Sequence, residues 1–114
     1  MKITGQGMLL RIFVGENDRW EGRPLHEALV LKAREAGLAG ATVVRGLEGF
    51  GAHSRLHTAK VLRLSEDLPL IIEIVDREER IRDFLPACDA MIHEGLVTLE
   101  RVEILKYAAD AKKS

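Results

Sequence analysis

The sequence predicts an α+β fold in which two helices cover one face of a four-stranded antiparallel sheet. Two segments carry apolar residues at helical spacing, and four others have the composition of strands, in the order βαββαβ. This order is that of the ferredoxin-like arrangement. The chain has 114 residues, 46% of them hydrophobic and 31% charged, which suits one compact domain covering residues 1–114.

The first strand and the first helix are expected near the N-terminus. Residues 8–14 (MLLRIFV) are apolar at nearly every position, which suits a strand covered on both faces. After a polar stretch, Pro24 can open a helix because the first turn needs no backbone donor there, and Gly37 can end it. The apolar residues at helical spacing between them are Leu25, Ala28, Leu29, Ala33 and Ala36.

The second and third strands are expected to enclose a long loop. Residues 41–47 (ATVVRGL) are β-rich and lead to Gly49 and Gly51, whose backbones have wide conformational freedom. Residues 52–67 are mostly polar and basic, so we expect them to form a loop that is mobile without ligand. Pro69 then opens the strand LIIEIVD.

The second helix is predicted by a continuous apolar stripe. Pro86 lies within this stripe and predicts a kink or a restart near residue 85. Beyond Gly95, residues 96–107 (LVTLERVEILKY) predict the fourth strand, and the tail 108–114 is expected to fray. The stripe consists of Ile81, Phe84, Leu85, Cys88, Met91 and Ile92.

The first and third strands, which should be central, carry apolar side chains on both faces of the sheet. Two helices can cover only one face, so the other must be covered from outside the monomer, most simply by self-association. Arg11 and Glu73 interrupt these strands. We expect them to form a structural pair, because no nucleophile or second carboxylate accompanies them for acid-base catalysis.

The amino-acid composition limits the possible functions of the protein and its possible location. Seventeen basic and eighteen acidic residues give a formal net charge of −1, so no overall field exists to attract nucleic acid or an anionic membrane. The single Cys88 cannot form an internal disulfide and should be buried. Neither a signal peptide nor an apolar run long enough to span a membrane is evident, so a cytoplasmic location is expected.

Several blocks of the sequence resemble those of the PII nitrogen-signalling proteins. These blocks are GATV at 40–43, GFG at 49–51, His57-Thr58 and LPLIIEIV at 68–75. More closely, the segments GENDRWEGRPLHEALV, AGLAGATVVRG, EGFG and LSEDLP are similar to the PII-like family called domain of unknown function 190. The resemblance covers nearly the whole chain.

This resemblance implies a homotrimer with small-molecule sites between subunits and a signalling loop between the second and third strands. The residues that it places near an adenine are Gly40, Ala41 and Thr42. Those that begin the loop beside the phosphates are Gly49, Phe50 and Gly51. Genes of this family often lie beside fluoride channels, so the resemblance suggests a membrane transporter or channel as the partner.

Two positions depart from the PII pattern. Ala52 replaces the basic residue that follows Gly-Phe-Gly, although Arg55 lies close enough to substitute for it. Residues 98–101 (TLER) replace the Gly-Asp-Gly-Lys phosphate turn before the last strand; Arg101 keeps the positive charge, whereas Glu100 would repel a phosphate. We therefore expect a nucleotide with one or two phosphates, or another anion, in preference to a triphosphate.

Other polar residues have two interpretations each. His53 and His57 are four residues apart and could hold a metal, but no cysteine or carboxylate lies between them, so a solvated pair is the simpler interpretation. Trp20 is expected to pack at a subunit contact in preference to stacking on a ligand. A basic rim around the glycine loop, or alternatively a charge-balanced loop, would be formed by Arg45, Arg55, Lys60 and Arg63.

Enzyme signatures are missing from the sequence. The GxG at 49–51 is neither a dinucleotide-binding motif nor a P-loop. We expect a ligand-sensing protein that needs no cofactor and takes an adenine nucleotide or another anion as its effector. The alternatives are a metal-binding trimer of the copper-tolerance type, using His53 and His57 or interface carboxylates, and a nucleotide hydrolase.

Overall fold

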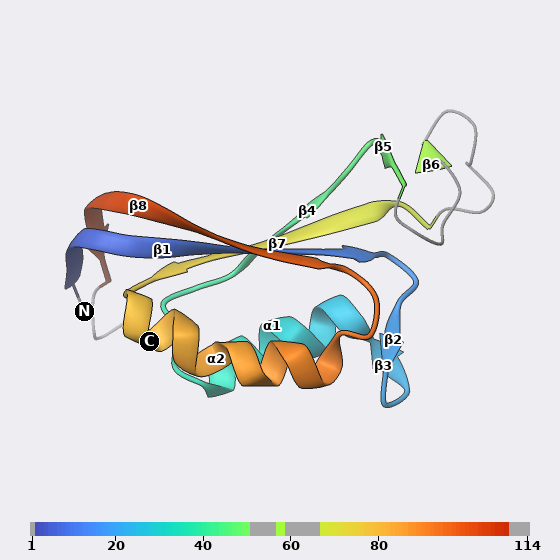
Figure 1. Ribbon diagram of the computed structural model, residues 1–114, viewed down its shortest axis with the longest axis horizontal. Coiled ribbons are helices and arrows are strands. Elements are labelled where there is room, and N and C mark those ends of the chain that lie inside the picture. The colour runs from blue at the N-terminus through green and yellow to red at the C-terminus, as the bar shows by residue number, and fades with distance from the viewer. Residues whose placement is uncertain (1, 51–56, 59–66, 110–114) are drawn as a thin grey trace.

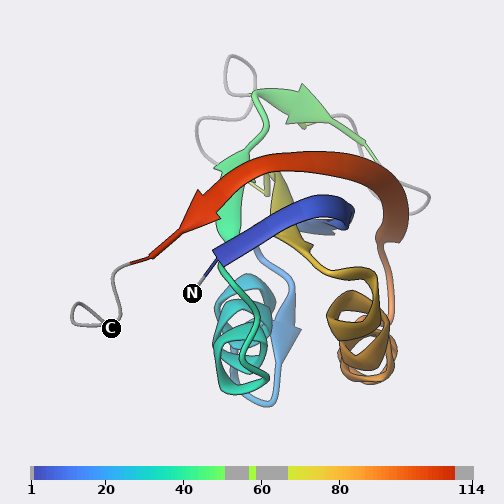
Figure 2. The same ribbon diagram turned by 90° about the vertical axis from the view of Figure 1, so that its left-hand side faces the viewer.

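The computed structural model describes residues 2–50, 57–58 and 67–109 of the chain. It confirms the predicted fold, a four-stranded antiparallel sheet with two helices on one face (Figures 1 and 2). The strand order is β4-β7-β1-β8, so the two strands predicted to be central are central. The strands are β1 Lys2–Gly15, β4 Thr42–Arg45, β7 Pro69–Asp76 and β8 Leu96–Ala108.

The two helices contact each other beneath the sheet (Figure 2). They are α1, Leu25–Glu35, and α2, Glu78–Met91. α2 continues without interruption through Pro86, so the predicted restart near residue 85 is wrong. Pro86 is exposed, while Phe84 and Cys88 on the inner face are buried, so packing stabilises the helix although one backbone hydrogen bond is missing.

The hydrophobic core lies between the helices and the inner face of the sheet. Alternate residues of β1 and β7 point into it, as the period of a strand requires. α1 and α2 contribute the stripes that their sequences predict. The most deeply buried apolar side chains are Leu10, Ile12, Leu29, Ile72, Ile74, Ile81 and Cys88.

The outer face of the sheet is not covered by any described part of the chain (Figure 1). Leu9, Phe13 and Ile71 are only half-buried there. Val75 is 40% exposed and Leu96 55% exposed. The prediction that the central strands are apolar on both faces is therefore confirmed.

A short hairpin between β1 and α1 was not predicted. Its strands are β2, Arg19–Trp20, and β3, Arg23–Pro24, and its turn residues Glu21 and Gly22 both have positive φ, 47° and 82°. Two such residues form the tight turn whose twist matches that of a hairpin. The hairpin directs Trp20 onto the core of its own chain, where it is half-buried, and the expected subunit contact of Trp20 stays a prediction.

The base of the expected signalling loop is a second short hairpin. Its strands are β5, Glu48–Gly49, and β6, His57–Thr58. The rest of the predicted loop 52–67 lies outside the described residues, apart from Asp67. At the C-terminus, β8 continues to Ala108, and the tail 110–114 lies outside the described residues.

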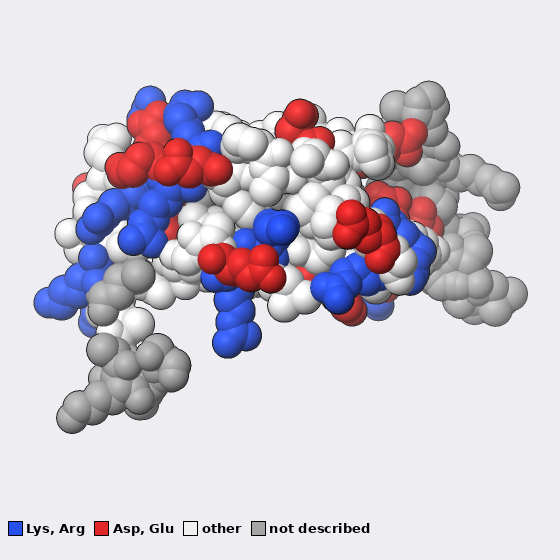
Figure 3. Space-filling view, turned by 90° about the horizontal axis from the view of Figure 1, so that it is seen from below, with Lys and Arg blue, Asp and Glu red and all other residues white. Residues whose placement is uncertain are grey.

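Charges are mixed over the helix-bearing side of the molecule. Figure 3 shows acidic and basic side chains lying next to one another there. This distribution agrees with the formal net charge of −1, so any anion site must be local. Within residues 2–50 and 67–109, neither helix has the length and apolar character needed to cross a membrane.

Candidate ligand site

The turn that joins α1 to β4 is firmly anchored at its start. The N–H of Gly37 donates to the Arg34 carbonyl, and the N–H of Leu38 donates to the Ala33 carbonyl. Gly37 has φ 81°, which an L residue adopts only with strain. Together these features form a Schellman motif, which ends the helix and satisfies two of its last carbonyls.

Ala39, two residues after Gly37, is held by hydrogen bonds at both its N–H and its carbonyl. Its N–H donates to Oδ2 of Asp76 over 2.9 Å, and its carbonyl accepts from the Tyr107 hydroxyl over 3.0 Å. Asp76 is the last residue of β7 and is 0% exposed. Two strands therefore fix the chain where the predicted site begins.

Gly40, Ala41 and Thr42, which the resemblance to PII proteins places near an adenine, follow this anchor directly. A Cβ added to Gly40 would meet nothing within 4 Å, so the backbone there is open to approach. Ala41 packs against the core, while Thr42 is exposed and pairs with Glu73 at the free edge of the sheet. The segment thus presents a backbone amide and a hydroxyl on a rigid support.

Gly49 and Phe50 lie beyond the other end of β4. Gly49 is in β5, where an added Cβ would lie 3.2 Å from Cγ of Pro69. Phe50 is 75% exposed. Gly51 and Arg55 lie outside the described residues. Because three strand residues separate Thr42 from Gly46, the two parts of the predicted site do not meet within one chain.

Arg101 lies inside the last strand, as the predicted strand 96–107 implies, and not in a turn before it. Residues 98–101 are inside β8, and the turn before that strand is formed by residues 92–95. Arg101 lies opposite Met8, with β1 and β7 between it and β4. This position follows from the pairing of β8 with β1, which begins opposite Phe13.

The charge of Arg101 is engaged by an acidic residue. Its Nη1 lies 3.1 Å from Oε1 of Glu78, which also pairs with Arg82. The hydrogen bond from Arg82 is the main cause of a lowered pKa of the Glu78 carboxyl, and the hydrogen bond from Arg101 is the next largest cause. The charge of Arg101 is thus partly offset within its own chain, while its side chain stays 64% exposed.

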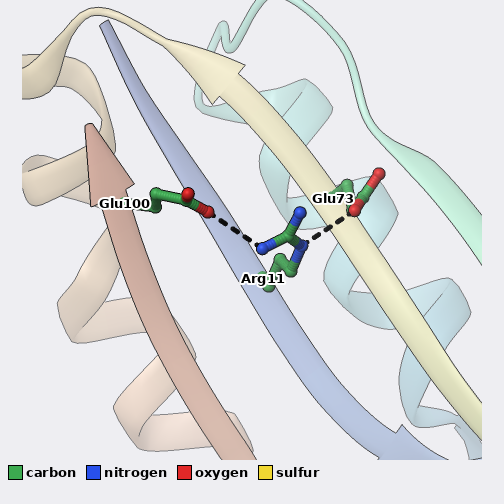
Figure 4. A network of polar contacts seen from close by, with 3 residues as sticks. All are labelled: Arg11, Glu73 and Glu100. Carbon is green, nitrogen blue, oxygen red and sulfur yellow. Dashed lines mark hydrogen bonds and ion pairs between the residues drawn. The ribbon is translucent and has the colours of Figure 1, made fainter. Parts of the chain in front are cut away.

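A second polar cluster lies on the uncovered face of the sheet (Figure 4). Nε of Arg11 lies 2.9 Å from Oε2 of Glu73, which confirms the predicted pair, and Nη1 lies 3.0 Å from Oε1 of Glu100. The hydrogen bond to Glu73 is the main cause of a raised pKa for Arg11. One guanidinium thus faces two carboxylates from the neighbouring strands, in the middle of an apolar surface.

The predicted metal ligands and basic rim are tested only in part. Within the described residues, no group of three or more His, Cys, Asp or Glu side chains could hold a metal. His53 lies outside those residues, and of His57 only the backbone pairing in β6 is described. In the predicted basic rim, Arg45 is ion-paired with Glu16, and the other three residues are not among those described.

A groove of about 560 Å³ lies between the C-terminus of α1 and the N-terminal half of α2. Phe84 and Ala87 line its apolar part. Two basic and two acidic side chains line the rest, so it has no charge of a single sign with which to select an anion. These charged residues are Lys32, Glu35, Arg80 and Asp83.

The sequence interpretation missed Asp76 and Tyr107. A signal for Asp76 was present: Leu70, Ile72 and Ile74 point inward by strand alternation, so the next inward position is that of a carboxylate, which must find donors. No comparable signal exists for Tyr107, since its partner is 68 residues away in the chain.

Comparison with protein families finds one matching family and clear relatives. The DUF190 family, described as Uncharacterized ACR, COG1993, matches residues 7–104. A UPF0166 protein of Aquifex aeolicus is 42% identical over 97 residues, covering 85% of this chain and 91% of the relative. A UPF0166 protein of Methanocaldococcus jannaschii is 33% identical over 99 residues, covering 86% of this chain and 91% of the relative.

Solved structures share the fold at low sequence identity. CPII, a nitrogen regulatory PII-like protein from Thiomonas intermedia bound to ADP, AMP and bicarbonate, has a TM-score of 0.60 at 19% identity, over 91% of each chain. The GlnK–ATP complex of B. subtilis has a TM-score of 0.58 at 14% identity, over 88% of this chain and 84% of that one. CutA1 from Oryza sativa has a TM-score of 0.56 at 15% identity, over 96% of this chain and 88% of that one.

Proposed function

Because the chain belongs to the DUF190 family and has the fold of the PII-like proteins, we propose that it is a PII-like regulatory protein that acts by binding a small effector and not by catalysis. The effector we propose is an adenine nucleotide. The observation that carries this proposal is that solved structures of the same fold, CPII and GlnK, contain ADP, AMP or ATP.

The geometry of residues 40–42 supports a base-binding role. The backbone of Gly40 is open to approach, and the exposed Thr42 hydroxyl lies two residues further along the same segment. An amide donor and a hydroxyl on a rigid support can form hydrogen bonds with the edge of a planar base. We place the adenine at this segment.

A second copy of the chain would complete the site. Residues 40–42 and residues 49–50 lie at opposite ends of β4, so one chain alone does not bring them together. The uncovered apolar face of the sheet supports self-association, and we propose a homotrimer in which each site lies between two subunits.

The charge distribution favours an effector with few phosphates. Arg101 is paired with Glu78 and Arg45 with Glu16, so the described cations of the predicted site are already engaged. Each further phosphate would have to displace a carboxylate or remain unpaired. We propose that AMP or ADP binds more tightly than ATP.

The signalling step is proposed from the family resemblance. The segment 52–67 would transmit the binding state to a partner, for which a membrane transporter or channel, such as a fluoride channel, is the candidate. The short hairpin of β5 and β6 would join this segment to the domain. Binding of this protein to such a channel, measured with and without ADP, would test the step.

Calorimetric titration with AMP, ADP and ATP tests the proposed effector. Gly40→Val adds a side chain where the structure has open space, so it should leave folding intact and weaken binding about tenfold or more by blocking the backbone. Arg23→Ala, on the exposed β2–β3 hairpin, is the matched control and should bind like the wild type.

Three outcomes would contradict the proposal. Absence of binding by all three nucleotides at millimolar concentration would exclude an adenine effector. Binding of copper by a protein that binds none of the nucleotides would support the metal-binding alternative. Conversion of the nucleotide during a long incubation, detected by product analysis, would indicate an enzyme.

A further inference from the structure

We infer that Tyr107 and Asp76 are positioning residues, which hold the peptide groups on either side of Ala39 and thereby fix the direction of the Gly40 amide toward the ligand. This inference rests on the proposed function and deepens it, because it names what gives the site its shape. It also links the site to the ends of β7 and β8.

Asp76 forms the buried part of this arrangement. Its side chain is fully buried, and a buried carboxylate is stable only when its oxygens accept hydrogen bonds. Oδ2 accepts from the N–H of Ala39, and Oδ1 accepts from the N–H of Arg77 over 2.7 Å. One side chain therefore joins the α1–β4 turn to the N-terminal end of α2.

Tyr107 provides the part that can be altered without damaging the core. It lies near the end of β8, beyond an irregularity in the β1–β8 pairing between Ile3 and Gly5, and it is half-buried. Such irregularities turn a side chain in a new direction. The Tyr107 hydroxyl donates to the Ala39 carbonyl, a contact from the last strand to the turn before β4.

The planarity of the peptide unit makes this contact relevant to the ligand. The Ala39 carbonyl and the Gly40 N–H belong to the same trans peptide, so they point in opposite directions. Holding the carbonyl at Tyr107 therefore aims the Gly40 N–H away from the Tyr107 hydroxyl. Among the described residues this N–H has no acceptor, and Gly40 is exposed.

The expected ligand chemistry follows from this geometry. A fixed N–H two residues before the exposed Thr42 suits a hydrogen-bond acceptor on a planar edge, such as a ring nitrogen of a purine. Without Tyr107, the peptide between Ala39 and Gly40 could rotate, and the ligand would have to order it on binding. The loss should therefore appear in affinity and local order, with little change in global stability.

The test compares Tyr107→Phe with Arg19→Ala. Both remove a hydrogen bond from a side chain to a backbone carbonyl, but the Arg19 bond, to Gly22 over 2.6 Å, lies in the distant hairpin. Tyr107→Phe should lower the NMR order parameter of the Gly40 amide from the rigid value of about 0.85. It should also weaken ADP binding about tenfold with little change in melting temperature. Arg19→Ala should do neither.

The two readouts separate this inference from the proposed function. An unchanged Gly40 order parameter in Tyr107→Phe overturns the inference, whether or not ADP binds. A lowered order parameter with unchanged ADP affinity overturns it as well, because the ligand then does not use the oriented amide. If the wild type binds no adenine nucleotide, the proposed function fails, and the inferred role of Tyr107 in positioning a ligand fails with it even if the order parameter falls.

Discussion

The reactivity of the Cys88 thiol is set by its surroundings. It lies on the inner face of α2 and is 2% exposed. Burial in this apolar environment raises the pKa of its thiol to about 11. Because the thiolate is the reactive form, the folded protein keeps Cys88 inert at neutral pH, as expected for a packing residue.

We predict that Cys88 resists alkylation only in the folded state. Iodoacetamide at pH 8 should react slowly with the native protein and rapidly in 6 M guanidinium, since unfolding removes the burial that raises the pKa. Mass spectrometry measures both rates. Equal rates would show that Cys88 is accessible in the folded protein.

The same pKa shift predicts a loss of stability at alkaline pH. The pKa of Cys88 is about 11 in the folded protein, against 9.0 for a cysteine free of the fold, so between these values the unfolded chain releases its proton first. Stability should therefore fall from pH 9 to pH 11. Cys88→Ala should cost about 1 kcal/mol at pH 7 and lose this part of the pH dependence in thermal unfolding.

At the scale of elements, the end of α1 depends on backbone geometry. Gly37→Ala should lower stability by about 1 kcal/mol, because Gly37 has φ 81° and alanine is strained there. Gly40→Ala is the matched control, since its φ is not positive and its added Cβ would meet nothing within 4 Å. Urea denaturation should show no loss for the control; equal losses would refute the role assigned to the Schellman motif.

Elements with a clear local sequence pattern were predictable, and those without one were not. The stripe of α2 and the apolar runs of β1 and β7 identified these elements. The first six residues of β1 were missed because they include glycines and polar side chains and are ordered by pairing with the end of β8. The β2–β3 hairpin was missed because its turn, Glu21-Gly22, lacks the usual Asn-Gly or Asp-Gly signal.

The candidate site was predictable to a similar degree. Residues 40–42 could be proposed from their resemblance to a known motif, and the structure places them on an anchored turn. Their supports, Asp76 and Tyr107, are 37 and 68 residues away from Ala39, a separation that no local pattern reveals. Residues 98–101, which the resemblance matched to a phosphate turn before the last strand, lie inside β8, as the predicted strand 96–107 implied.

At the scale of the whole molecule, the uncovered face of the sheet predicts assembly. Val75→Glu should convert the proposed trimer to monomers, because it places a charge on the apolar face that the subunits would bury. Leu31→Glu is the matched control: Leu31 is 43% exposed and Val75 40%, but Leu31 lies on α1. Light scattering should give a trimer for the control; a trimer for both would place the interface elsewhere.

The last prediction concerns the charged cluster at the centre of that face. Arg11 lies between Glu73 and Glu100, and its pKa is raised chiefly by the hydrogen bond to Glu73. Arg11→Glu would place three carboxylates together on the surface to be buried. Like charges in a desolvated interface repel strongly, so the dissociation constant of the assembly should rise by more than about tenfold at pH 7.

The pH dependence of Arg11→Glu gives the decisive measurement. The carboxylate introduced at position 11 takes up a proton as the pH falls toward 4.5, which removes its repulsion with Glu73 and Glu100, so assembly should recover in acid. Wild-type assembly should not strengthen in this way, because its Arg11 is a cation paired with Glu73 and Glu100 and adds no repulsion that acid could remove. Arg23→Glu, which adds the same charge on the exposed hairpin, should assemble like the wild type at every pH. Size-exclusion chromatography with light scattering from pH 4.5 to pH 8 distinguishes these cases, and an Arg11→Glu protein that is fully assembled at pH 7 would place Arg11 outside the interface.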